Sequence, residues 1–319
     1  MQARVYKSTG NWYQLKNKQG ESFNARIIGK LKISGISSTN PIAVGDYVEI
    51  ENQADIESTI ITNILPRINY INRVSPHNKN QHHIIASNLD QSLLFATLKD
   101  PKTSFGFIDR FLVTSEAYHV PAIIVYNKAD LFKKKEEEKF LLAKEIYEPL
   151  GYKIMRMSIE NNEGVEEVKA LLANKTTLLS GHSGVGKSTF LNTVFPDLKL
   201  RTKEVSGWSG KGLHTTTFAE MFDLPTGHAG LPSDEHRNGG TVIDTPGIRE
   251  MGIADIPWAE LAHYFPEMRA LINECQFNNC MHLEEPGCAV KEAVNKGTVH
   301  TERYVSYMNI LDTIEKKMY

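Results

Sequence analysis

A run of residues near the middle of the chain has the types and spacing of a phosphate-binding loop. Gly181-His182-Ser183-Gly184-Val185-Gly186-Lys187-Ser188 fits the pattern G-x-x-x-x-G-K-[ST], and Thr189 follows it. Glycines let backbone N–H groups turn inward around phosphates, the lysine supplies positive charge, and the serine hydroxyl is a ligand for Mg²⁺. An apolar strand pattern precedes the run and a helical pattern follows it, a context that a chance glycine-rich turn does not require. We therefore predict that residues 181–189 hold the phosphates of a nucleotide.

A second motif, Asn127-Lys128-Ala129-Asp130, follows the apolar run 122–126. A carboxylate only accepts hydrogen bonds, so Asp130 would pair with the N1–H and N2–H₂ donors of guanine; adenine has an acceptor at N1 and no 2-amino group. Asn127 can bridge the two loops, and the stem of Lys128 can cover the base plane. Alone, this short match is more often a turn, but beside a phosphate loop it predicts a guanine nucleotide. Ser158 is a looser match to a further base-supporting residue.

Two further segments have residues suited to Mg²⁺ and a γ-phosphate. Asp244 follows an apolar run, so its carboxylate would lie at a strand end and hold Mg²⁺ together with Ser188, while the Gly247 amide would contact the γ-phosphate. Upstream, His214-Thr215-Thr216-Thr217 offers hydroxyls on a glycine-rich loop that could become ordered around the ion; the alternative is an ordinary polar loop.

The residue after Gly247 is Ile248, where Ras-like GTPases have a glutamine that orients the attacking water. An isoleucine cannot orient water. We therefore expect slow intrinsic hydrolysis, with His214 as the candidate water-orienting group and Thr215 and Thr216 beside it. A histidine that only contacts RNA or packs is the alternative.

All three cysteines of the chain lie in one stretch, Cys275-x₄-Cys280-x-His282-x₅-Cys288. Their odd number excludes a framework in which every cysteine is paired. Three thiolates and one imidazole form a complete tetrahedral donor set, so Cys275, Cys280, His282 and Cys288 predict one structural Zn²⁺ site. The alternative is a group of buried or redox-active thiols.

The segments that must position these motifs alternate between strand and helix patterns. Strands are expected at 93–96, 122–126, 153–157 and 177–179, and helices at 105–119, 132–147, 165–173 and from 187. This alternation predicts an α/β domain whose mostly parallel sheet is covered on both faces, with ligands at the carboxyl ends of the strands.

The two ends of the chain have other patterns. Short β-rich runs near the N-terminus predict a five-stranded OB-like β-barrel, although a small sandwich fits nearly as well. Residues 67–83 predict a linker, and helices at 258–273 and 289–295 flank the cysteines. We predict three domains: an OB-fold-like β-barrel at 1–72, a GTPase domain at 73–250 and a helical zinc-binding domain at 251–319.

Composition sets only broad limits. The 319 residues include 36 basic and 38 acidic side chains, a net charge of −2, so bulk charge favours no partner. No apolar run approaches the roughly 20 residues of a membrane span, and the start lacks a signal-peptide core, so we expect a cytoplasmic protein with no membrane partner. A local basic stretch, Lys199, Arg201, Lys203 and Lys211 around Trp208, could meet RNA, or it is a solvated loop.

The order of the motifs is informative, because linear Ras-like GTPases have the phosphate loop first and the guanine loop late. Here residues 127–130 precede residues 181–188, which indicates a circularly permuted GTPase. With the β-rich start and the cysteine module, nearly the whole chain resembles the RsgA (YjeQ) family. The match includes Gly-x-Ser-Gly-Val-Gly-Lys-Ser and a Gly-Arg-His-Thr-Thr-Thr switch at 212–217. Departures are Leu213 for the arginine, His182 for the usual glutamine, and an enlarged hairpin loop at 226–240.

The resemblance implies a GTP hydrolase of bacteria that binds the immature 30S ribosomal subunit near its decoding region, is stimulated by it and assists late assembly. Implied partners are the 30S subunit with its 16S rRNA, GTP or GDP, and Mg²⁺; we expect a monomer. Three alternatives stay open: a non-hydrolysing GTP-dependent rRNA-binding scaffold, a large-subunit assembly GTPase, and a P-loop ATPase or kinase, against which residues 127–130 argue.

Overall fold

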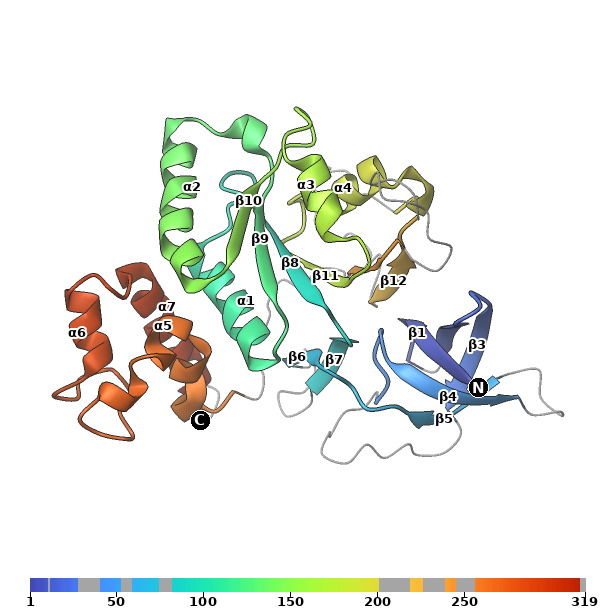
Figure 1. Cartoon of the computed structure of the whole chain (residues 1–319), viewed down its shortest axis with the longest axis horizontal. Coiled ribbons are helices and arrows are strands. Elements are labelled where there is room, and N and C mark those ends of the chain that lie inside the picture. The colour runs from blue at the N-terminus through green and yellow to red at the C-terminus, as the bar shows by residue number, and fades with distance from the viewer. Residues whose placement is uncertain are drawn as a thin grey trace, which may run out of the picture.

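The computed structural model consists of a β-barrel, a helix-covered sheet and a group of C-terminal helices (Figure 1). It describes residues 1–10, 12–27, 41–52, 59–74, 82–200, 219–225, 239–244 and 256–315. Within these ranges, no helix combines the length and the apolar character that crossing a bilayer requires.

The N-terminal strands form the closed barrel. They are β1 (Gln2–Ser8), β2 (Tyr13–Asn17), β3 (Ser22–Ile27), β4 (Tyr47–Asn52) and β5 (Thr59–Ile64). The strands pair in the order β1-β2-β3-β5-β4, and β4 pairs back to β1. Along β2, Tyr13 and Leu15 are buried while Gln14 between them is exposed, so one face of the strand fills the barrel core. The predicted barrel is confirmed.

The predicted linker at 67–83 is wrong where two short strands form. Strands β6 (Tyr70–Val74) and β7 (His82–Ser87) pair antiparallel, with Ile71 opposite Ala86, and both of these residues are buried. The strand pattern of β6 is weak in the sequence because a single buried isoleucine stands among the polar residues Asn72 and Arg73. Tertiary packing, and not a local alternation of apolar and polar residues, therefore determines that this segment forms a strand.

The central sheet has the predicted parallel arrangement. Its strands are β8 (Gln91–Ala96), β9 (Ala122–Tyr126), β10 (Lys153–Arg156), β11 (Thr176–Ser180), β12 (Glu220–Asp223) and β13 (Thr241–Asp244). The order is β10-β9-β8-β11-β13-β12, parallel except that β12 runs antiparallel to β13. Since β12 and β13 are antiparallel neighbours, they flank the predicted hairpin loop, of which residues 226–238 lie outside the described residues.

Helices cover both faces of this sheet. They are α1 (Phe105–Ala117), α2 (Lys134–Tyr147), α3 (Val165–Leu171) and α4 (Lys187–Val194), with 3-10 turns at Ala129–Leu131, Glu148–Leu150 and Pro196–Leu198. On β8, Leu94 and Ala96 pack with α1 and α2, whereas Leu93 and Phe95 pack with α3 and α4. The alternation of apolar side chains along a fully buried strand produces these two layers.

The C-terminal helices pack on α1, below the sheet in Figure 1. They are α5 (Pro266–Arg269), α6 (Ala289–Asn295) and α7 (Thr301–Glu315), with 3-10 turns at Trp258–Tyr264 and Ile272–Glu274. The helix predicted at 258–273 is wrong as one element, because Phe265 is extended before Pro266, and a residue preceding proline disfavours the helical conformation. The helix predicted at 289–295 is confirmed.

The barrel and the central sheet are joined directly. Strand β1 pairs antiparallel with the edge strand β12, with Lys7 opposite Glu220, and the Nζ of Lys7 lies 2.9 Å from the Oε2 of Glu220. The hydroxyl of Tyr6 donates to Asp223 Oδ1 at 2.6 Å, and Lys16 forms an ion pair with the same carboxylate. The strands therefore form one continuous ladder from β10 to β4.

Candidate nucleotide site and metal centre

The strand register brings the predicted nucleotide-binding segments to one edge of the sheet. Tyr126 ends β9 opposite Ala96 of β8 and Arg156 of β10, and Leu179 on β11 is opposite Asp244, which ends β13. At or just after these carboxyl ends lie all of the predicted nucleotide-binding segments that the structure describes: residues 127–130, Ser158, residues 181–188 and Asp244. This edge is where α/β sheets bind ligands.

The phosphate loop has the backbone that its glycines allow. Gly181, Gly184 and Gly186 have φ angles of 131°, 85° and 99°, in the region that disfavours side chains. A Cβ at Gly186 would lie 2.2 Å from the Nδ2 atom of Asn127, so any larger residue there would displace the guanine loop. The loop ends at the first residue of α4, Lys187, as predicted.

Asn127 connects the two predicted ligand loops. Its side chain is 2% exposed, and its Nδ2 donates to the carbonyl oxygen of Val185 in the phosphate loop at 2.8 Å. Its backbone N–H donates to Ala96 O at 2.8 Å, which fixes the residue at the end of β9. The Oδ1 atom is buried and has no hydrogen-bond partner among the described residues.

Ser158 and Asp130 are also brought together. The Ser158 hydroxyl donates to Asp130 Oδ1 at 2.6 Å and accepts from the Asn161 N–H at 3.2 Å. The Ala129 N–H donates to Met157 O at 3.0 Å, so the guanine loop and the 158 loop hold one another. The carboxylate of Asp130 is thereby fixed in one orientation, which a base-reading acceptor needs.

Lys128 reaches across to the loop between β8 and α1. Its backbone is left-handed, with φ 62°, and its Nζ donates to the carbonyl oxygen of Asp100 at 2.5 Å. No residue pattern indicates this partner in advance, because any residue type can supply a backbone carbonyl.

Two carbonyl oxygens of the phosphate loop hold the side chain of Lys187. Its Nζ donates to Gly181 O at 2.8 Å and to His182 O at 3.1 Å. Burial lowers the pKa of Lys187, and the charge of Asp244 acts in the opposite direction, so Asp244 lies close enough to interact with it. Burial and the charge of Lys187 also lower the pKa of His182, whose ring packs on Phe107 with centroids 3.9 Å apart.

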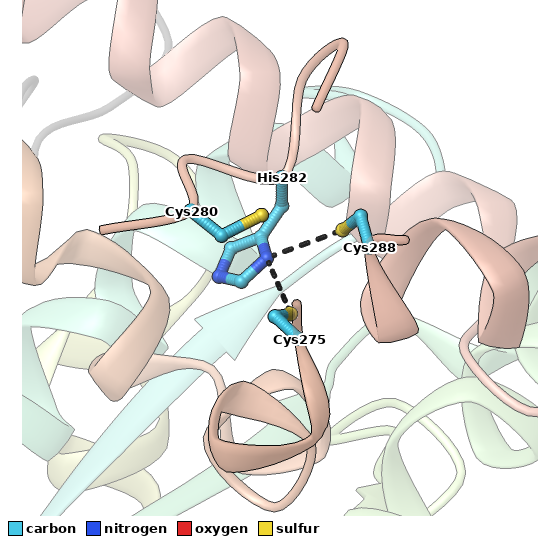
Figure 2. A group of neighbouring side chains, drawn as sticks. All are labelled: Cys275, Cys280, His282 and Cys288. Atoms are coloured by element: carbon cyan, nitrogen blue, oxygen red, sulfur yellow. Dashed lines mark hydrogen bonds between the residues drawn. The ribbon is translucent and has the colours of Figure 1, made fainter. Parts of the chain in front are cut away.

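The four predicted metal ligands form a compact cluster (Figure 2). Their donor atoms all lie within 4.8 Å of one another, and His282 Nδ1 is 3.6 Å from Cys275 Sγ and 3.4 Å from Cys288 Sγ. In a tetrahedral site with Zn–S near 2.3 Å and Zn–N near 2.0 Å, the S···N edges are about 3.5 Å. The donor set and its spacing therefore fit a metal ion of this kind.

Burial sets the protonation of the cluster in a way that also fits a cation. Burial lowers the pKa of His282, which keeps the imidazole in the neutral form that binds metals. It raises the pKa of the Cys280 thiol to about 12, so a bound cation is needed to stabilise the thiolate. The hydroxyl of Tyr304 donates to His282 O at 2.6 Å and that of Tyr307 to Met281 O at 2.8 Å, so α7 holds the loop that carries the ligands.

Other predicted residues lie outside the described residues. They are His214, Thr215, Thr216, Gly247, Ile248 and the basic residues Arg201, Lys203, Trp208 and Lys211.

Comparison with known proteins agrees with this architecture. The chain matches the family model described as RsgA GTPase over residues 64–254 and the model of the RsgA N-terminal domain over residues 2–60. The protein named small ribosomal subunit biogenesis GTPase RsgA is 47% identical in Flavobacterium psychrophilum, covering 97% of this chain and 91% of that one. In Cytophaga hutchinsonii it is 48% identical, covering 98% of both.

Two solved structures are also similar. YjeQ from Thermotoga maritima has a TM-score of 0.73 at 32% identity, covering 98% of this chain and 97% of that one. YloQ, described as a circularly permuted GTPase, has a TM-score of 0.69 at 27% identity, covering 99% and 95%. The permuted order of motifs predicted from the sequence is therefore confirmed, and the chain belongs to the RsgA GTPase family.

Proposed function

We propose that this GTPase acts in biogenesis of the small ribosomal subunit, and that the 30S subunit stimulates its hydrolysis of GTP during late assembly. One contact carries the proposal for the site: Asn127 Nδ2 reaches Val185 O at 2.8 Å, which joins a guanine-reading loop to a phosphate-binding loop. The names of the relatives in Flavobacterium and Cytophaga, which the chain matches over nearly its full length, support the process.

In the proposed site, Asp130 accepts from the guanine N1–H and N2–H₂ groups while Ser158 fixes its orientation. The stem of Lys128 covers the base plane, and the side chain of Asn127 sets the distance between the base and the phosphates. The phosphates would lie within residues 181–189, where Lys187 exchanges its two carbonyl partners for phosphate oxygens.

Ser188 and Asp244 are the proposed Mg²⁺ ligands, since Ser188 is the second residue of α4 and Asp244 ends β13 at the same sheet edge. Mg²⁺ would neutralise charge that develops on the phosphates. For hydrolysis we propose that His214 orients the attacking water, with Thr215, Thr216 and the Gly247 amide near the γ-phosphate. His214→Ala should then remove the stimulated turnover and preserve GTP affinity; unchanged stimulated turnover would exclude that role.

We make four further assignments: the metal, the RNA partner, the location in the cell and the oligomeric state. We propose that the metal is Zn²⁺ in a structural role, because the donor set of three cysteines and one histidine is complete. We propose that 16S rRNA is the partner and that it is contacted by the barrel, at 1–72, and by the zinc domain, at 251–319. The GTPase domain, at 73–250, lies between them in the sequence. We place the protein in the cytoplasm as a monomer.

The deciding experiment is phosphate release from GTP and from ATP, by the purified chain alone and with isolated 30S or 50S subunits. Lys187→Ala serves as the control for contaminating nucleotidases. We expect GTP-specific stimulation by 30S alone. Stimulation by 50S alone would identify a large-subunit factor, and tight GTP binding without stimulated release would identify a scaffold.

A further inference from the structure

Helix α1 contacts the nucleotide loops near its N-terminus and the C-terminal helices along the rest of its length. Val113 of α1 belongs to the hydrophobic cluster of the C-terminal body, and Ala117 packs against the same cluster. Figure 1 shows α1 between the sheet and α7. No other helix among the described residues has hydrophobic residues in that C-terminal cluster and also follows directly from a loop at the nucleotide edge.

At its N-terminal end, α1 and the loop before it support both ligand loops. Phe107 packs on His182 of the phosphate loop with centroids 3.9 Å apart, and the carbonyl of Asp100 accepts from Lys128 of the guanine loop at 2.5 Å. The loop is itself held closed, since Thr103 N–H donates to Thr97 O at 2.8 Å and Thr97 N–H to Thr103 Oγ1 at 3.0 Å. A shift of α1 would therefore be transmitted to both loops.

Two residues after Phe107, α1 is fixed to the C-terminal body by a buried ion pair. Arg303 of α7 is 1% exposed, and its Nη1 donates to Oδ1 of the fully buried Asp109 at 2.6 Å. Arg303 also holds Glu267 of α5 with two bonds, from Nε at 2.6 Å and from Nη2 at 3.2 Å. Its guanidinium lies over the ring of Phe265, 4.5 Å from the centroid. The geometry leaves Arg303 a single arrangement.

The same carboxylate also reaches the helix that follows the guanine loop. Tyr147, the last residue of α2, donates to Asp109 Oδ1 at 2.8 Å. Burial and the charge of Asp109 raise the pKa of Tyr126, the last residue of β9, which directly precedes Asn127. A buried salt bridge is weak as a source of stability and is better suited to specifying one arrangement of the elements it joins.

We propose that Arg303 and Asp109 are positioning residues for nucleotide binding: the C-terminal body sets the relative placement of the guanine and phosphate loops through α1. The inference rests on the proposed nucleotide site. Its consequence is that whatever the C-terminal body docks on can change nucleotide affinity without touching the nucleotide.

The test uses the full-length, metal-loaded chain and a fluorescent GDP analogue. Arg303→Gln should raise the GDP dissociation rate about fivefold or more, the lower end of common coupling between sites. Arg269→Gln is the matched control, because Arg269 links the same helix and the same body through Glu116 at 3.1 Å but is 50% exposed. It should leave the rate within about twofold. Arg303→Lys, which keeps the positive charge, should raise the GDP dissociation rate less than Arg303→Gln does.

A double-mutant cycle separates positioning from loss of stability. Phe107→Leu acts at the nucleotide end of α1, so its effect on GDP dissociation and that of Arg303→Gln should be less than additive. A lowered unfolding temperature with an unchanged GDP dissociation rate, or fully additive effects, would overturn the proposal.

A second measurement on the unmodified chain covers the case in which Arg303→Gln does not fold. By reciprocity, GDP should slow hydrogen exchange in α7, far from the nucleotide. Unchanged exchange in α7 at saturating GDP would also overturn the proposal. Failure of the unmodified chain to bind GDP would instead contradict the proposed site, so the two failures are distinguishable.

Discussion

At the scale of single residues, the site depends on side chains that are fixed before any ligand arrives. Asp130 is oriented by the Ser158 hydroxyl, and Asn127 is held by Val185 of the opposite loop. Acceptors that are already oriented lose little free energy to reorganisation when a ligand binds, so a preference for guanine can depend on a few atoms.

Asp130→Asn should therefore remove most of the preference for guanine. The substitution replaces two charge-assisted hydrogen bonds with an amide that also presents donors to the guanine donors. At about 1.5–3 kcal/mol for hydrogen bonds to a charged group, GTP affinity should fall about 10- to 150-fold. Competition binding with GTP and ATP measures this. Ser158→Ala removes the orienting bond and the bond from the Asn161 N–H but keeps the Asp130 carboxylate, so it should cost less; an equal loss would mean that Asp130 does not contact the base.

His182 should make the stability of the chain depend on pH. Burial and Lys187 lower its pKa below the ordinary 6.5, so the unfolded state binds more protons between the lowered value and 6.5. The stability that depends on neutral His182 is fully present above pH 6.5 and is lost as the pH falls from 6.5 through the lowered pKa. His182→Gln, which does not titrate, should show a shallower decline of the unfolding temperature between pH 7.5 and 5.5. A parallel decline would exclude the role of His182.

At the scale of elements, the metal loop and α7 stabilise each other. Tyr304 and Tyr307 hold the adjacent carbonyl groups of His282 and Met281, in a loop between Cys275 and Cys288 that contains little regular structure. A metal ion bound by the four predicted ligands would crosslink this loop and stabilise the small C-terminal body.

Metal removal should thus unfold the C-terminal body first. A chelator should release about one Zn²⁺ per chain and lower the first unfolding transition by at least about 10 °C, because structural zinc contributes several kcal/mol. Metal analysis with calorimetry measures both. Cys288→Ser should reproduce the loss without a chelator. Retained zinc in that variant would show that the ligand set is wrong.

Local patterns predicted most elements, and the failures have physical causes. Apolar alternation located β8, and the helical period located α1, because each pattern is repeated over several residues. Strand β6 was missed because its burial depends on one isoleucine. The prediction of one continuous helix at 258–273 was wrong because Pro266 interrupts the helical conformation there. Sequence motifs predicted the loops that the structure brings to one edge of the sheet, and their roles as ligand loops stay predictions. The Asp109–Arg303 pair joins residues 194 positions apart, and the only sequence signal is an aspartate on the apolar face of a helix.

At the scale of the whole molecule, both end segments are attached to the GTPase sheet through specific contacts. The barrel contacts the edge strand β12, and the C-terminal body contacts α1. In the sequence, strand β12 lies between the predicted switch at 212–217 and the predicted hairpin loop at 226–240. A change in the predicted switch would therefore reach the barrel through the four residues of this strand.

The pairing of β1 with β12 also protects a strand edge from self-association. In a shortened chain that starts at residue 65, the N–H and C=O groups along that side of β12 would have no neighbouring strand, and such an edge is a template for pairing with other molecules. Light scattering should show this fragment aggregating at concentrations where the full chain stays dispersed. That result would give the barrel a second role, as a cap on one edge of the central sheet.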